Sequence, residues 1–123
     1  MYTRIFEKYQ KNDPTSVMWF EPASFPDEIG ILSGVVVPVG FLTPPGGEIG
    51  SPNHVLNDHT YCCQLSATAC LSGEPDLNLA AQCHSWHEKR IGTRAHDAVR
   101  LGVPLMISEF GACLTEAPCT QEI

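Results

Sequence analysis

A helical pattern between two short apolar segments constrains the fold more than any other feature of this chain. Residues from about 77 to 101 show the helical spacing, and Gly102 and Pro104 predict where that helix ends. Gly92 weakens its centre, so a break there stays open. The segments 55–61 and 104–108 on either side are typical of strands. The inward-facing side chains expected for the helix are Ala80, Cys83, His87, Ile91, Ala95 and Ala98.

The preceding part of the chain extends this alternation of elements. Residues 2–11 have the apolar spacing of a helix, which Asn12-Asp13-Pro14 stops. Residues 16–20 predict a buried strand. Residues 23–53 are rich in Pro and Gly and predict a loop, in which GVVVPVGF at 34–41 is at most a short edge segment. The order helix, strand, loop, strand, helix, strand indicates parallel βα units.

Polar residues stand at the ends of the expected strands. Glu109 follows 104–108, Glu21 follows 16–20, and His59 and Tyr61 lie two apart, on one side of 55–61. In parallel α/β folds the side chains at the carboxyl ends of the strands form the active site. We therefore expect Glu109 to lie where such a fold carries its chemistry.

Composition and charge narrow the class of protein. The chain has 123 residues, 43% of them apolar and 17% charged, as in a globular protein with one modest domain. A net charge of −7 with only 7 Lys and Arg argues against a nucleic-acid partner. No segment approaches the roughly 18 apolar residues of a membrane span, and MYTRIFEKYQKND is no signal peptide.

The cysteine content points to disulfides. The chain has 6 cysteines without a CxxC pair, and an even number suggests disulfides and an oxidising compartment. Pairing cannot be deduced, although Cys63 with Cys70 and Cys113 with Cys119 are short-loop candidates. A zinc site is the alternative, for which the candidate ligands are His54, His59, Cys62, Cys63, Cys83, His84 and His87.

Three segments in order carry a resemblance to a known family. ISEFG at 107–111, H-x-Y at 59–61 and SVMWFEP at 16–22 resemble the seventh, sixth and fifth strand regions of glycoside hydrolase family 5, in its endoglycoceramidase-like branch. PPGG at 44–47 and GEP at 73–75 are similar to that branch too. The resemblance implies an α/β fold in which residues 1–123 are part of a (β/α)8 TIM barrel, a partial glycoside hydrolase catalytic domain.

The resemblance also implies an activity and roles for the four residues. A retaining hydrolase of O-glycosyl bonds in glycosphingolipid-type β-glycosides would use Glu109 as its nucleophile, and no metal or cofactor. Tyr61 would hydrogen-bond to the nucleophile, His59 would line the sugar pocket, and Glu21 would line the cleft rim or pair with a cation. The general acid of the family lies in an N-E-P motif on the fourth strand, which this chain lacks. We expect the isolated chain to be inactive, unless Glu21 in F-E-P replaces that acid.

Partners and location follow from the same resemblance. The substrate would be a glycolipid or oligosaccharide, reached at a membrane surface through a rim near 38–50, and the remainder of the barrel would be a structural partner. The parent protein would be extracellular or lysosomal. Trp19 and Trp86 are more typical of packing than of sugar stacking. The alternative function is a non-catalytic, secreted, disulfide-stapled domain that binds a glycan or lipid.

Overall fold

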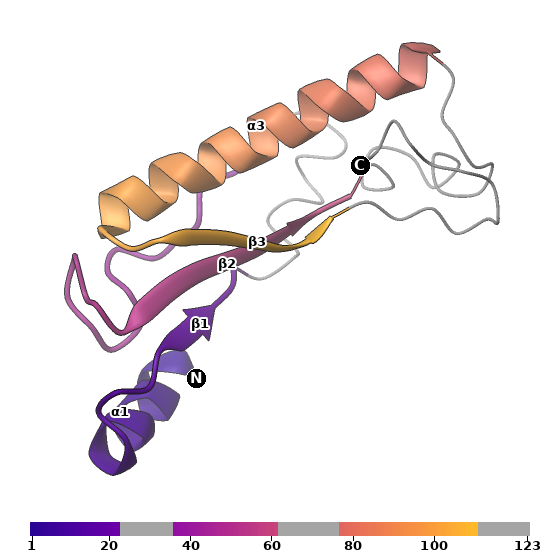
Figure 1. Ribbon diagram of the computed structural model, residues 1–123. Coiled ribbons are helices and arrows are strands. Elements are labelled where there is room, and N and C mark those ends of the chain that lie inside the picture. The colour runs from indigo at the N-terminus through magenta and orange to yellow at the C-terminus, as the bar shows by residue number, and fades with distance from the viewer. Residues whose placement is uncertain (23–35, 62–76, 111–123) are drawn as a thin grey trace, which may run out of the picture.

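The structure, a computed structural model, describes residues 1–22, 36–61 and 77–110. Within them the elements follow the predicted order, and their bounds agree with the prediction to within about two residues. One difference matters for function, because Glu109 lies inside the last strand and not after it. The elements are α1 (Tyr2–Asn12), β1 (Met18–Phe20), β2 (His54–Thr60), α3 (Leu77–Leu101) and β3 (Leu105–Phe110) (Figure 1).

The three strands form one parallel sheet. Its order is β1-β2-β3, so that neighbours in the chain are neighbours in the sheet. Helix α3 runs along β2 and β3 on one face of the sheet, and α1 lies beyond β1 (Figure 1). The chain is thus a mixed α/β protein, as the alternation of helical and strand patterns predicts. None of the helices in the described ranges has the length and apolar character needed to cross a bilayer.

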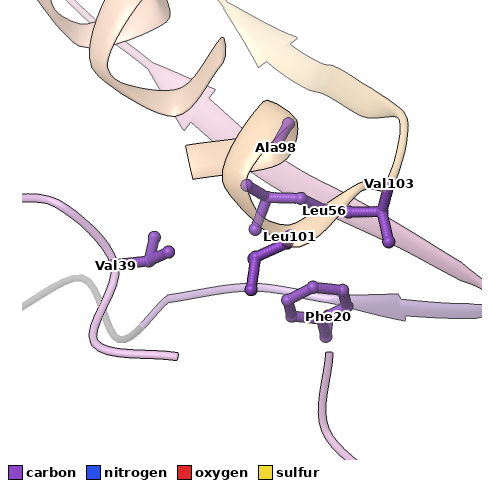
Figure 2. Close-up of a cluster of buried hydrophobic side chains, with 6 residues drawn as sticks. All are labelled: Phe20, Val39, Leu56, Ala98, Leu101 and Val103. Carbon is purple, nitrogen blue, oxygen red and sulfur yellow. The ribbon is translucent and has the colours of Figure 1, made fainter. Parts of the chain in front are cut away.

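A small apolar core joins the sheet, the end of α3 and the segment before β2. Phe41 packs edge-on against Phe20, with ring centroids 5.3 Å apart. Burial of apolar side chains away from water stabilises the folded state. The side chains of this core therefore hold the sheet against the end of α3. The buried cluster consists of Phe20, Val39, Leu56, Ala98, Leu101 and Val103 (Figure 2).

The inward side of α3 is more polar than predicted. Ile91 and Ala95, expected to face inward, are exposed, although Cys83 and Ala98 of the same prediction are buried. The prediction was wrong for Ile91 and Ala95 because it left out the long charged side chains, which are buried when they find partners. The inward-facing set also includes Trp86, Arg90, Arg94 and Asp97.

Buried opposite charges join α3 to β2. Asp58 on β2 accepts hydrogen bonds from Arg90 Nη2 at 2.8 Å and from Arg94 Nε at 2.5 Å. Asp97 lies 3.5 Å from Arg94 Nη1 and 3.0 Å from Arg100 Nη2. Arg94 is fully buried and Asp58 is 5% exposed, so each charge has lost its water and depends on its partner.

The same charges hold the segment before β2. Arg94 Nη1 donates to the carbonyl of Val37 at 2.8 Å, and Asp97 Oδ2 accepts the N–H of Val39 at 2.8 Å. Arg100 donates to the carbonyls of Phe41 and Val39. The described part of the expected edge segment, residues 36–41, forms no strand, because side chains of α3 satisfy its backbone groups.

Replacing Asp58 by Asn is expected to destabilise the fold strongly. The amide keeps the shape of the side chain but removes the charge opposite two buried guanidinium groups, which costs about 3–5 kcal/mol. Urea unfolding of the variant measures this loss. Glu88→Gln on the solvent side of α3 is the matched control and should change stability by less than about 0.5 kcal/mol. A loss below about 1 kcal/mol at Asp58 would contradict this account.

Helix α3 runs unbroken through Gly92 and ends at Leu101, directly before Gly102. Gly102 has a φ of +67°, and the N–H of Val103 returns to the carbonyl of Ala98 at 3.1 Å. A Cβ at Gly102 would lie 2.7 Å from the backbone nitrogen of Gly50, whose N–H donates to the Leu101 carbonyl. The left-handed backbone and the close approach of the loop both require glycine here.

The two glycines of this region should therefore respond in opposite ways to alanine. Gly102→Ala should destabilise the protein by about 1–3 kcal/mol, because it strains the backbone and pushes against Gly50. Gly92→Ala should stabilise it by up to about 1 kcal/mol, because its Cβ would meet nothing within 4 Å and alanine favours the helix. Thermal unfolding of both variants tests the pair, and equal shifts would refute the helix-end geometry.

Candidate active site

The sheet turns two different faces to its surroundings. Leu56, Asp58 and Thr60 of β2 are buried on the side of α3, and Asp58 and Thr60 bond to residues of that helix. Asn57 and His59 alternate with them and therefore project from the opposite face. This opposite face of β1, β2 and β3, with the residues that directly follow β1 and β2, is called the open face below.

A shift in strand pairing brings Glu109 to the open face. Asp58 pairs with Ile107, but the next residue of β2, His59, pairs with Glu109, so that Ser108 is an extra residue in β3. Regular pairing would place Ser108 beside His59, and Glu109 opposite Thr60 on the side of α3. Such a bulge changes the direction of the side chains that follow it. The bulge thus explains how an acid inside β3 joins His59.

Tyr61 and Glu109 are in direct contact on the open face. The Tyr61 hydroxyl donates a hydrogen bond to Glu109 Oε2, as the family resemblance implies. This hydrogen bond raises the pKa of Tyr61 to about 12, because the phenol would lose it on ionising beside a carboxylate. The same hydrogen bond restricts the position of one oxygen of Glu109.

His59 lies between two carboxylates. Its Nε2 is 3.5 Å from Glu21 Oε1, and its Nδ1 is 3.7 Å from Glu109 Oε2. Asn57 Nδ2 donates a hydrogen bond to the same Glu21 oxygen. Glu21 is therefore tied to β2 through two side chains of the open face. The Glu21, Asn57, His59, Tyr61 and Glu109 group is called the carboxylate cluster below.

The main chain of His59 is held from the other face of the sheet. Its N–H donates to Asp58 Oδ1 at 2.8 Å, and its carbonyl accepts a hydrogen bond from Arg90 Nε at 2.5 Å. Both partners belong to the buried ion pairs between β2 and α3. The buried charges thus position the backbone that carries the imidazole.

The four residues predicted from the sequence all meet in the carboxylate cluster. Side-chain exposures of 29% for His59, 43% for Glu21 and 57% for Glu109 leave them accessible to a ligand. Trp19 is half exposed on the open face, whereas Trp86 is 2% exposed and packs inside the protein. Tyr61 stands edge-on to His59, with ring centroids 6.4 Å apart.

The prediction missed Asn57 and Asp58. Alternation along β2 was the available signal, since it places Asn57 on the side of His59 and Tyr61. Asp58 had a weaker signal, a charged residue within a segment expected to be buried. Its partners on α3 are distant in sequence and give no local pattern that points to it.

The zinc alternative is not supported by the described part of the chain. Cys83 is disulfide-bonded, so it offers no thiolate. His54 bonds to Ser51 and to the Pro45 carbonyl, and burial lowers its pKa. Among the residues that the structure describes, no three His, Cys, Asp or Glu side chains are grouped as metal ligands. The other candidate cysteines and both short-loop pairs lie outside these residues.

The carboxylate cluster combines two carboxylates with an imidazole, a phenol and an amide that can donate or accept hydrogen bonds. Carboxylates, an imidazole and a phenol at the carboxyl ends of parallel strands suit general acid–base chemistry.

Comparison with known proteins finds no relative: no family model, no curated protein and no solved structure matches this chain.

The contact between Tyr61 and Glu109 predicts a change in titration. In Glu109→Gln the pKa of Tyr61 should fall from about 12 toward the ordinary value of about 10, because the neutral amide no longer disfavours phenolate. The ring ¹³Cζ signal of labelled tyrosine reports this directly. Glu88→Gln should leave the pKa of Tyr61 unchanged. A wild-type Tyr61 that titrates near 10 would show that the bond is absent in solution.

Proposed function

We propose that this chain is part of a retaining glycoside hydrolase that resembles the endoglycoceramidase-like branch of family 5, with Glu109 as nucleophile. The observation that carries the proposal is the hydrogen bond from Tyr61 to Glu109. These residues belong to H-x-Y and ISEFG, the motifs that led to the resemblance. They meet across neighbouring parallel strands although 48 positions separate them in the chain.

The arrangement of the sheet is compatible with a barrel origin. Parallel strands whose order in the sheet follows the chain, with a helix between β2 and β3, are what consecutive units of a (β/α)8 barrel have. The open face corresponds to the inner face of such a barrel. Trp19 and Met106 are 51% and 44% exposed on it, as expected of side chains that further strands would cover.

The reaction assigned to Glu109 is a double displacement. A Glu109 oxygen forms a bond to the anomeric carbon, and the bond from that carbon to the aglycone oxygen breaks with its electron pair on the oxygen. A carboxylic acid gives that oxygen its proton, and water later hydrolyses the glycosyl ester. The resemblance places the acid in an N-E-P motif, which this chain lacks, so we expect the 123-residue chain alone to be inactive.

The remaining roles follow the same proposal. Tyr61 orients Glu109, His59 lines the sugar pocket and Glu21 stands at the cleft rim, and the reaction uses no metal or organic cofactor. The substrate is a glycosphingolipid-type β-glycoside, so the enzyme meets membranes or micelles through its substrate. A glycolipid of this kind is met outside the cell or in the lysosome, where disulfides such as that of Cys83 persist.

Turnover of a glycosphingolipid by the full-length protein that contains this segment tests the proposal. Glu109→Gln should lower kcat by about a thousandfold or more, because an amide cannot form the glycosyl ester. Glu88→Gln should keep full activity. Full activity in Glu109→Gln would reject Glu109 as nucleophile. Glycan binding without turnover in the full-length protein would favour the non-catalytic binding domain.

A further inference from the structure

Glu21 is a second carboxylate of the cluster for which the proposed reaction has no step. It directly follows β1, and its side chain is 43% exposed. Its backbone N–H donates to the Tyr2 hydroxyl at 3.4 Å, so α1 also holds this residue. Its Oε1 faces both Asn57 Nδ2 and His59 Nε2. Glu21 thus has a fixed place and a fixed direction.

Asn57 makes this attachment rigid. Its side chain projects from the middle of β2 and the residue is 4% exposed, so the amide has little freedom to rotate. The hydrogen bond from Asn57 Nδ2 orients one oxygen of Glu21, and that oxygen is the one nearest to His59. Asn57 therefore fixes where Glu21 meets the imidazole.

His59 then connects the two carboxylates. Its main chain is bound to Asp58 and Arg90, which leaves rotation of the side chain as the remaining freedom. While Nε2 lies 3.5 Å from Glu21 Oε1, the other ring nitrogen, Nδ1, lies 3.7 Å from Glu109 Oε2. The imidazole thus restricts Glu109 from one side, and the Tyr61 hydroxyl restricts the same oxygen from another.

We propose that Glu21 is a positioning residue, which through His59 holds Glu109 in the direction needed for attack on a glycoside. The inference rests on the proposed function and deepens it. Glu21 needs only an acceptor atom for this task, whereas a general acid needs a carboxyl proton. The two roles therefore differ in their response to glutamine, which keeps the acceptor and has no acidic proton.

Labelling of Glu109 in the full-length protein measures this role. The probe is 2,4-dinitrophenyl 2-deoxy-2-fluoro-β-glucoside. A Glu109 oxygen bonds to its anomeric carbon, and the bond to dinitrophenolate breaks with the electron pair, so no general acid is required. Intact-protein mass spectrometry gives the maximal labelling rate and the half-saturating probe concentration for each variant.

A positioning residue gives a distinctive set of rates. Glu21→Ala should lower the maximal rate about tenfold to a hundredfold, as small misplacements of reacting groups do, with the half-saturating concentration nearly unchanged. Glu21→Gln should stay within about threefold of wild type. A wild-type rate in Glu21→Ala overturns the proposal. An equal loss in Glu21→Gln also overturns it and assigns the carboxylate itself a role.

Modification of His59 gives a reading that does not depend on glycosidase activity. Diethyl pyrocarbonate acylates accessible imidazole nitrogens, and peptide mapping follows each histidine. In Glu21→Ala the rate of acylation at His59 should rise several-fold, because no side chain at position 21 then covers Nε2. In Glu21→Gln this rate should stay near that of the wild type. His84, with a side chain 75% exposed, is the internal reference.

The two readings separate this inference from the proposed function. An unchanged His59 rate in Glu21→Ala overturns the positioning role whatever the labelling result. No label on wild-type Glu109, together with the expected rise at His59, rejects the glycosidase function but supports the hold of Glu21 on His59. Thermal unfolding of each variant identifies any loss that comes from misfolding, and Glu21→Gln then decides the result.

Discussion

The buried pairing of Asp58 with Arg90 and Arg94 is the interaction on which the rest of this structure depends. Charges removed from water are tolerated only when opposite charges and hydrogen bonds replace the solvent, so the pairing fixes the distance and angle between α3 and β2. Asp97 and Arg100 extend the same pairing to residues 36–41. Segments far apart in the sequence are thus held by charges as much as by the apolar core.

This pairing reaches the carboxylate cluster through one residue. The main chain of His59 is bonded to Asp58 and Arg90 on one face of the sheet, and its side chain lies between Glu21 and Glu109 on the other. Adjacent residues of β2, Asp58 and His59, therefore carry the buried charge on the side of α3 and the polar group on the open face. A rigid strand between them is what a precisely oriented site requires.

The sequence predicted the elements and their order, because apolar spacing and Gly or Pro boundaries are local signals. Its strand pattern also predicted a site at the strand ends that includes Glu109, whereas the contact of Tyr61 with Glu109 was predicted only by the family resemblance. It did not predict the bulge at Ser108, which depends on pairing with β2. Nor did it predict the polar inward side of α3, because Arg90 and Arg94 are buried only in the presence of Asp58.

The side chains of the carboxylate cluster are exposed to water on the open face. Glu109 and Glu21 have side chains 57% and 43% exposed, so water screens the contacts that Tyr61 and His59 make with them. If the proposed function is right, a closed barrel would cover Trp19 and Met106, exclude that water and strengthen each contact. On the proposed function, the described strands therefore supply the direction of the nucleophile, and barrel closure supplies the low-dielectric environment together with the acid.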